Sequence, residues 1–475
     1  MSKTKEKSIE ELLEEALVPE EEQPYEVPEN WIWVKLESVH DIITGSTPSK
    51  KVPQYYGGSF PIIKPGDLDQ GDSVILASEY LSDEGKAKSR IIPRNSTLVC
   101  CIGSIGKAGF TLVDCTTNQQ INSLVAIKNT VVPKYTYYFS LSESFRQALI
   151  SRSSSTTISI INKFKMGQIP FPLPPYSEQR KISKEIDSLF AKIDEAKRLI
   201  DQAKESFELR RASILDKAFR GELTREWRES RQCFLAQPLK DHLSLITNAP
   251  YVLPLIWDWV YLEDVCDKIT DGTHHSPESF PVGKYKYITA KNIKESGISL
   301  DDITYVPEEV HREIFKRCDV RYKDILYIKD GATTGVATIN NLKEEFSLLS
   351  SVGVLRTKSS ILNPEYLVYC LNSPNIKKMM LNLMTGSAIK RLTLTKIKKG
   401  IIPLPPIEEQ NKIVDILKTL FKNEEVQANN IPDKELGRIK QSILMKAFRG
   451  ELGTNNSSEK SSIDLLIQEL KEKSN

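Results

Sequence analysis

Apolar residues recur along one otherwise polar segment with the spacing of a coiled-coil seam. They alternate at intervals of four and three residues, at Ile182, Ile186, Leu189, Ile193, Ala196, Ile200, Ala203 and Phe207. This pattern predicts a helix over residues 178–218, roughly 60 Å long at ~1.5 Å per residue. Because its apolar stripe is narrow, the helix needs a partner helix.

A second segment keeps the same seam imperfectly. Glu424 and Gln427 occupy seam positions, and Pro432 cannot lie inside an unbroken helix, although it suits the first turn of a new one. Apolar positions resume the seam on both sides of this interruption, at Ile413, Leu417, Leu420, Leu436, Ile439 and Ile443. We therefore expect a second long helix that is broken or kinked near residues 427–432.

Two other segments, residues 26–175 and 250–406, show a shorter pattern. Runs rich in Ile, Val and Tyr alternate there with clusters of Gly, Pro, Asn and Ser. STLVCCIG, SLVAIKN and VGVLRT predict strands, whereas YTYYFSLSESFRQALI and PEYLVYCLNSPNIKKMML predict helices. Each segment is therefore expected to form an α+β globular domain.

Three phrases occur twice, in the same order and 226 to 231 residues apart. They are a Trp-x-Trp-Val phrase, a Pro-Leu-Pro-Pro phrase and KAFRGEL, which begin at Trp31 and Trp257, at Pro172 and Pro403, and at Lys217 and Lys446. Such a separation describes a duplicated module of about 225 residues rather than a solenoid. The prolines predict a stiff extended joint between domain and helix, and Gly221 and Gly450 predict the helix ends.

Composition narrows the class of protein only in part. The 65 basic and 63 acidic residues give a formal net charge of +2, so a nucleic-acid partner would have to be bound by a local patch. The seven cysteines form no Cys-x-x-Cys pair, which favours a reducing cytoplasm over a disulfide scaffold. The N-terminal residues lack the apolar core of a signal peptide, and no apolar run is long enough to predict a membrane span.

The duplicated domains, the PLPP-x-x-EQ phrase, the long helix and KAFRGEL together resemble the specificity subunit of type I restriction–modification systems. The resemblance covers residues 26–452, and GSIGK at Gly103, TNQQIN at Thr117 and DGATTG at Asp330 also fit it. It implies an α+β fold in which two target-recognition domains are separated by two long antiparallel helices, with an internal pseudo-twofold repeat.

The same resemblance implies a DNA-binding subunit without chemistry of its own. Each domain would read one half of a split double-stranded DNA target, while the helices set the spacing and bind two modification (methyltransferase) subunits. Those subunits would carry S-adenosylmethionine, and restriction (translocase and endonuclease) subunits would supply ATP- and Mg²⁺-dependent steps. We expect no cofactor, metal or catalytic residue on this chain.

We divide the chain accordingly. Residues 1–25 form a charged tail with a short helix that Ser8 and Glu11 begin as a capping box. The remaining predicted segments are target-recognition domain 1 (26–175), the central helix (176–222), a linker (223–249), target-recognition domain 2 (250–406), the C-terminal helix (407–452) and a tail with a short helix (453–475). The tails are either disordered or dock onto a modification subunit.

Sequence features of an enzyme are weak. LPPY at Leu173 lacks the Asn or Asp with which amino-methyltransferases hold their target, and a structural joint explains it better. GSIGKAGFT at Gly103 lacks phosphate-loop spacing and predicts a tight turn. The alternatives that stay open are a self-contained DNA methyltransferase or nuclease, and a coiled-coil scaffold without a DNA role.

Loops rich in Lys, Arg, Ser and Thr are the candidate DNA contacts, because such side chains bind phosphates and base edges. Solvated turns have the same composition, so each single residue is a weaker prediction than its loop. The candidates in the first domain are Ser46, Thr47, Lys50, Lys51, Tyr55, Tyr56, Lys107, Arg152, Ser153, Ser154, Ser155 and Thr156. Those in the second domain are Thr273, His274, His275, Lys284, Lys286, Ser387, Lys390 and Arg391.

Overall fold

The computed structural model describes residues 8–153, 160–230, 246, 250–384, 391–429, 433–456, 459 and 461–474. Its contacts divide the chain into two compact units. Met1–Leu199 and Pro432–Asn475 form the first unit, and Ile200–Ile431 form the second. Helix α6, Tyr176–Phe219, contributes its first half to the first unit and its second half to the other.

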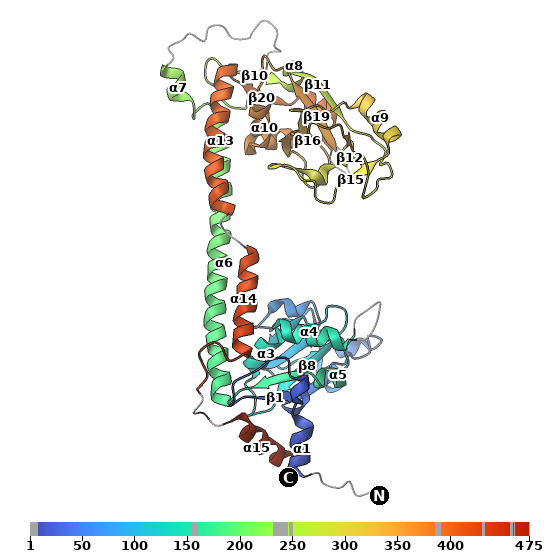
Figure 1. Cartoon of the computed structure of the whole chain (residues 1–475). Helices are drawn as coiled ribbons and strands as arrows, with labels where there is room; N and C mark the ends of the chain where they lie inside the picture. The colour runs from blue at the N-terminus through green and yellow to red at the C-terminus, as the bar shows by residue number, and fades with distance from the viewer. Residues whose placement is uncertain are drawn as a thin grey trace. The chain divides into compact units, whose positions relative to one another are not determined.

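The first unit is built on an antiparallel sheet with the strand order β2-β8-β5-β6. A smaller sheet, β4-β3-β7, and the pair β1-β9 accompany it (Figure 1). The strands are β1 (Ile32–Lys35), β2 (His40–Thr44), β3 (Tyr56–Ile63), β4 (Glu79–Leu81), β5 (Ser96–Cys100), β6 (Ala108–Thr111), β7 (Thr116–Thr117), β8 (Ile121–Ala126) and β9 (Pro170–Leu173).

Helices from both ends of the chain complete the first unit. Besides the first half of α6 they are α1 (Ile9–Ala16), α2 (Asp83–Ala87), α3 (Pro133–Ser140), α4 (Glu143–Arg152), α5 (Lys163–Gly167), α14 (Asp433–Phe448) and α15 (Ser462–Ser474). Short 3₁₀ turns are η1 (Glu20–Glu22), η2 (Leu36–Ser38), η3 (Pro53–Tyr55) and η4 (Asp67–Gln70). The predicted capping box at α1 is confirmed, since Ser8 and Glu11 bond each other's backbone N–H groups at 2.8 and 3.2 Å.

The second unit repeats this strand order. Its sheets are β11-β19-β16-β17, β15-β12-β18 and β10-β20, and a short hairpin, β13-β14, is added. The strands are β10 (Asp258–Tyr261), β11 (Cys266–Asp271), β12 (Tyr285–Ile288), β13 (Ile293–Lys294), β14 (Gly297–Ile298), β15 (Thr304–Val306), β16 (Ile325–Ile328), β17 (Ala337–Ile339), β18 (Ser347–Leu348), β19 (Val352–Thr357) and β20 (Ile401–Leu404). The predicted duplication therefore extends to the topology of every sheet that both copies share.

The helices of the second unit surround its sheets and its half of α6. They are α7 (Arg225–Ser230), α8 (Leu262–Val265), α9 (Glu308–Arg317), α10 (Pro364–Asn372), α11 (Pro374–Asn382), α12 (Leu394–Lys398) and α13 (Ile407–Asn429), with the 3₁₀ turn η5 (Ala290–Asn292). The mixed content of helices and sheets in both units agrees with the predicted α+β class.

Two of the repeated phrases are partners in one strand pair. Trp33 lies opposite Pro172 in the β1-β9 pair, and Trp259 lies opposite Pro403 in the β10-β20 pair. The prolines are tolerated because these strands have only one ladder partner each in the sheet order. The Trp phrase and the Pro-Pro phrase therefore recur together because they form the two strands of one pair in each unit.

The Glu-Gln of the same phrase fixes the beginning of each long helix. The indole N–H of Trp31 donates to Glu178 and that of Trp257 donates to Glu409, both at 2.9 Å. Gln179 bonds the Thr130 and Pro174 carbonyls and accepts from the Val132 N–H, and the second copy repeats this through Gln410. The phrase thus joins helix to domain through buried hydrogen bonds as well as through its prolines.

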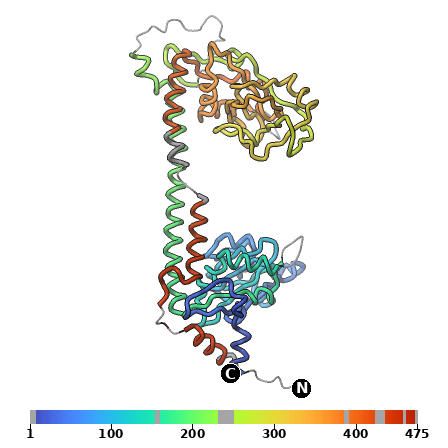
Figure 2. The backbone as a smooth tube through the Cα atoms, in the orientation of Figure 1, coloured from blue at the N-terminus to red at the C-terminus, as the bar shows by residue number. Residues whose placement is uncertain are grey.

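Each half of α6 packs against an antiparallel helix of its own unit (Figures 1 and 2). In the first unit the core includes Ile182, Ile186, Leu444, Ala447 and Phe448. In the second it includes Leu215, Phe219, Ile413, Leu417 and Phe421. The prediction that the long central helix needs helical partners is confirmed. The phenylalanine of each KAFRGEL phrase, Phe219 or Phe448, is buried in the core of its unit.

Separate helices precede and follow the region of the predicted break. Helix α13 ends at Asn429 and α14 begins at Asp433, while residues 430–432 lie outside the described part of the chain. The other predicted helix ends do carry glycine in the left-handed region, with φ of 77° at Gly221 and 74° at Gly450.

Candidate nucleic-acid interface

Several chain segments of the second unit meet where strands β11 and β16 end. Asp271 ends β11, Lys329 follows β16 directly, and Leu392 donates its backbone N–H to the Lys329 carbonyl at 3.1 Å. Gly272 permits this crowding, because a Cβ there would lie 2.0 Å from the Leu348 carbonyl oxygen. Asp271, Gly272, Thr273 and Leu392 therefore lie at one edge of the sheet.

Charged side chains alternate along this edge. Asp271 is 2% exposed and accepts a hydrogen bond of 2.6 Å from Arg317 Nη2. Lys329 Nζ lies 3.4 Å from Asp271 Oδ2 and 3.5 Å from Asp330 Oδ2. Arg391 Nε forms an ion pair with Asp330 Oδ1 at 3.4 Å. The row Arg317–Asp271–Lys329–Asp330–Arg391, called here the charged row, thus has buried Asp271 and Lys329, half-buried Asp330 and two exposed arginine ends.

The predicted His-His loop lies against one end of the charged row. His274 Nε2 lies 2.8 Å from Arg317 Nη2 and 3.4 Å from Asp271 Oδ1. Thr273 bonds the backbone of His275 and caps the turn. Of the two histidines, His274 contacts the charged row in the part of the chain that the structure describes, and His275 is bonded through its backbone to Thr273.

Lys284 and Lys286 lie elsewhere in the unit, beside and within β12. Lys286 Nζ bonds Glu344 at 2.7 Å, and this bond holds the pKa of Glu344 below its usual value. Lys284 is exposed, and its hydrogen bond with Tyr285 raises the pKa of its ammonium group. Both lysines have partners within the unit, and neither belongs to the charged row.

The first unit anchors corresponding segments at the equivalent edge. Ile161 donates its N–H to the Cys101 carbonyl at 3.0 Å, and a Cβ on Gly45 would lie 2.1 Å from the Asn118 carbonyl oxygen. Among the described residues, the hydrogen bonds between side chains at this edge join neutral groups, while the Arg90 guanidinium donates to the Thr44 carbonyl at 2.8 Å. Thr47 bonds Gln119 at 2.8 Å, and Asn118 bonds Gln120 at 2.9 Å. The two units therefore present the same frame with different chemistry.

Other candidates of the first unit lie around this edge. Ser46 accepts from the Arg90 N–H at 3.3 Å, and the Tyr56 hydroxyl donates to the Pro48 carbonyl. Lys50 pairs with Glu79 at 3.6 Å and Lys107 pairs with Asp69 at 2.8 Å. Lys51 is exposed and Tyr55 is half-buried in η3.

The glycine-rich phrase before Lys107 forms a turn, with φ of 78° at Gly103 and 84° at Gly106, as predicted. Arg152 ends α4 and Ser153 caps it. The remaining candidates lie outside the described residues, and they are Ser154, Ser155, Thr156, Ser387 and Lys390.

Several members of the charged row were not among the predicted site residues. Asp330 was noticed only as part of a phrase, and Asp271, Arg317 and Lys329 were not singled out. Arg317 ends an ordinary amphipathic helix, so no local pattern marks it. Only the crossing of β11, β16 and α9 brings these side chains together.

Within the described ranges, no three His, Cys, Asp or Glu side chains are close enough to hold a metal ion. No helix in that same part of the chain is both long and apolar enough to cross a bilayer.

Comparison with known proteins now gives the family. The family described as "Type I restriction modification DNA specificity domain" matches the chain twice, over residues 28–205 and 254–434. The chain is 24% identical over 436 residues to the EcoBI specificity subunit of Escherichia coli, covering 90% of this chain and 87% of that one. It is 24% identical over 435 residues to the MjaIX specificity subunit of Methanocaldococcus jannaschii, covering 90% and 94%.

A solved chain from work on complex assembly and conformational transition of the type I restriction–modification system shares the fold. The TM-score is 0.67 at 22% identity, and the match covers 90% of this chain and all of the other. The solved chain thus shares the duplicated α+β fold, and the family match identifies both units as DNA-specificity domains. The chain belongs to the family of type I restriction–modification specificity proteins, whose members recognise DNA and are not enzymes.

Proposed function

We propose that each unit reads one half of a bipartite double-stranded DNA target for a type I restriction–modification complex. The observation that carries this proposal is the pair of equivalent sheet edges, which share strand order and anchoring hydrogen bonds but differ in side chains. A common frame with different contact residues is suited to two different half-sites. DNA specificity as such follows from membership of the family.

The long helices are proposed to set the distance between the half-sites. Helix α6 has 44 residues, about 66 Å at ~1.5 Å per residue, which exceeds one DNA turn of ~34–36 Å. The target should therefore contain a gap of base pairs that neither unit contacts. The same helices would bind two modification subunits carrying S-adenosylmethionine, and restriction subunits using ATP and Mg²⁺ would join them in the cytoplasm. The described cysteines are free and buried, which is compatible with a reducing compartment.

A deletion tests the spacing directly. Removing one heptad from residues 186–207 shortens the helix by about 10 Å, which corresponds to about three base pairs at ~3.4 Å each. Mapping the methylated sites of the reconstituted complex should show a gap shortened by that amount, with both half-sites unchanged. Removing seven residues from 231–245, the part of the predicted linker that follows α7, is the matched control and should leave the gap as it is. A heptad deletion that leaves the gap unchanged would contradict the proposal.

A further inference from the structure

The charged row is built unlike an ordinary basic patch. Its three cations, Arg317, Lys329 and Arg391, face two carboxylates, so its formal net charge is only +1. Phosphate binding depends on accumulated positive charge, and here two of three charges are compensated. The arrangement therefore favours a role in which the direction of the donors matters more than the charge.

Each of the two arginines is bound to a carboxylate through one defined nitrogen atom. Arg317 is bonded through Nη2 and Arg391 is paired through Nε, while their side chains remain 51% and 60% exposed. Each guanidinium has five N–H donors, so donors remain available on both after these contacts. Holding a long side chain in place before binding lowers the entropy lost when it meets its partner.

Arginines held in this way have donors suited to the acceptors of guanine. Guanine presents the O6 and N7 acceptors in the major groove, and a bidentate arginine is the commonest specific contact to them. Resting on the proposed bipartite recognition, we propose that Arg317 and Arg391 read guanines in the half-site of the second unit. Asp271, Lys329 and Asp330 are positioning residues that fix the two guanidinium groups.

The test uses the full complex reconstituted with its modification subunits. Arg317→Gln and Arg391→Gln are compared with the wild type on a panel of duplexes in which each base pair of the target is changed in turn. The matched control is Arg312→Gln, because Arg312 lies on the same helix, is 71% exposed and pairs with Glu308. Each of the two test variants should lose about 10- to 100-fold in affinity for the wild-type target and should relax one G·C position of the second half-site. The control should keep full discrimination.

Asp330→Asn tests the positioning role, since Asp330 is more accessible than Asp271 and its loss should be tolerated. It should weaken discrimination at the same base pair as Arg391→Gln, by a smaller factor. A purely structural carboxylate would instead change thermal stability without changing which base is preferred.

Two failures are distinguishable. If the wild-type complex shows no bipartite preference, the proposed function itself is wrong. If the wild type is bipartite but the arginine variants lose affinity equally for every sequence, with a salt slope reduced by about one, the arginines bind phosphate and the inference is overturned. Unchanged discrimination, or relaxation at an A·T pair, would overturn it as well.

Discussion

At the joint between domain and long helix, an ion pair occupies the same two positions in both units, but its two charges are exchanged. In the first unit, Lys134 of α3 lies 2.9 Å from Asp72 and 3.8 Å from Asp187 of α6. In the second, the equivalent residues are Glu365 of α10 and Lys418 of α13, whose charged atoms lie 2.5 Å apart. The ion pair is kept while its sign is exchanged, so the contact between helix and domain depends on complementarity rather than on particular residues.

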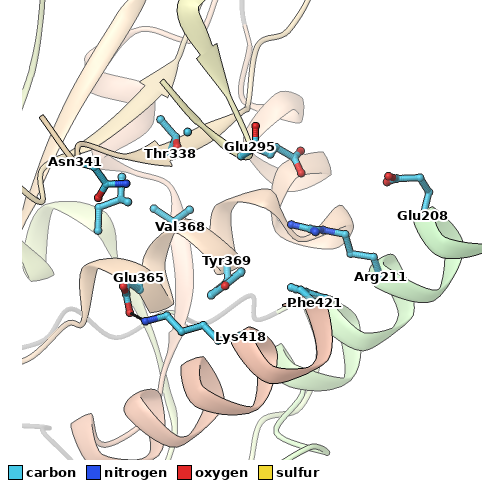
Figure 3. Close-up of a pocket in the computed structure, with 13 residues that line it drawn as sticks. Glu208, Arg211, Glu295, Thr338, Asn341, Glu365, Val368, Tyr369, Lys418 and Phe421 are labelled. Atoms are coloured by element: carbon cyan, nitrogen blue, oxygen red, sulfur yellow. Dashed lines mark hydrogen bonds and ion pairs between the residues drawn. The ribbon is translucent and has the colours of Figure 1, made fainter. Parts of the chain in front are cut away.

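The side chains packed at this joint also differ between the two units. Lys134 lies 5.3 Å from the Phe110 ring centroid and 5.7 Å from that of Tyr137, whereas the equivalent residues in the second unit are Ile339 and Val368. The smaller side chains border a pocket of about 450 Å³ there, above Tyr369 and Phe421 (Figure 3). The two copies of the fold thus tolerate different side chains at positions that pack near the surface.

The buried glutamates at the two helix starts differ in their compensation. Glu409 accepts from Trp257, Thr224 and Arg228. Glu178 is equally buried and accepts from Trp31, but within the described residues no cation forms an ion pair with it. Burial raises the pKa of Glu178, and the Trp31 hydrogen bond partly opposes this. One joint is therefore held by a charge pair and the other by a carboxylate that burial penalises.

Removing Arg228 should have the largest effect. Arg228→Ala leaves Glu409 as an uncompensated buried charge, which we expect to cost about 3–5 kcal/mol of the free energy of unfolding of the second unit. Hydrogen exchange of the β10 and α7 amides reports that unit separately. Arg225→Ala, an exposed residue on the same helix, is the control and should change exchange little. Equal effects of the two variants would show that the ion pair does not stabilise the joint.

Removing an aromatic ring from the joint of the first unit should have the next largest effect. Tyr137 is 5% exposed, so Tyr137→Val removes a packed ring and should cost about 2–4 kcal/mol of unfolding free energy. The reciprocal change, Val368→Tyr, faces the pocket and should alter stability by about 1 kcal/mol or less. Urea unfolding of the full chain measures both. Similar costs in the two units would contradict the view that the pocket beside Val368 can hold a larger side chain.

The uncompensated Glu178 should give the first unit a distinct pH dependence. Because its pKa is raised in the folded state, its contribution to stability is complete below its ordinary pKa of 4.5 and is lost as pH rises through the raised value. The stability difference between wild type and Glu178→Gln should therefore favour the wild type increasingly on acidification. Unfolding midpoints between pH 4 and pH 8 measure this, and a difference that is constant with pH would exclude the explanation.

Sequence patterns predicted the frame well because its signals are local or repeated. The heptad seam from Ile182, the paired Trp and Pro-Pro phrases and the glycines at helix ends each reflect a rule that acts over a few residues. The charged row could not be predicted in this way. Asp271, Arg317 and Lys329 are far apart in sequence and meet only because β11, α9 and β16 converge. The partners of Glu178 and Glu409 were missed for the same reason.

The smallest predicted effect concerns the exposed part of the first joint. Lys134→Ala removes the ion pairs with Asp72 and Asp187 and the contacts with the aromatic rings, but these groups are partly solvated. We expect a loss of about 0.5–1 kcal/mol in unfolding free energy, decreasing at high salt. Lys134→Met keeps most of the aliphatic stem, so the difference between the two variants isolates packing from charge. A loss that is the same at low and high salt would show that packing alone holds this position, and that the exchange of sign between the two joints has no energetic consequence.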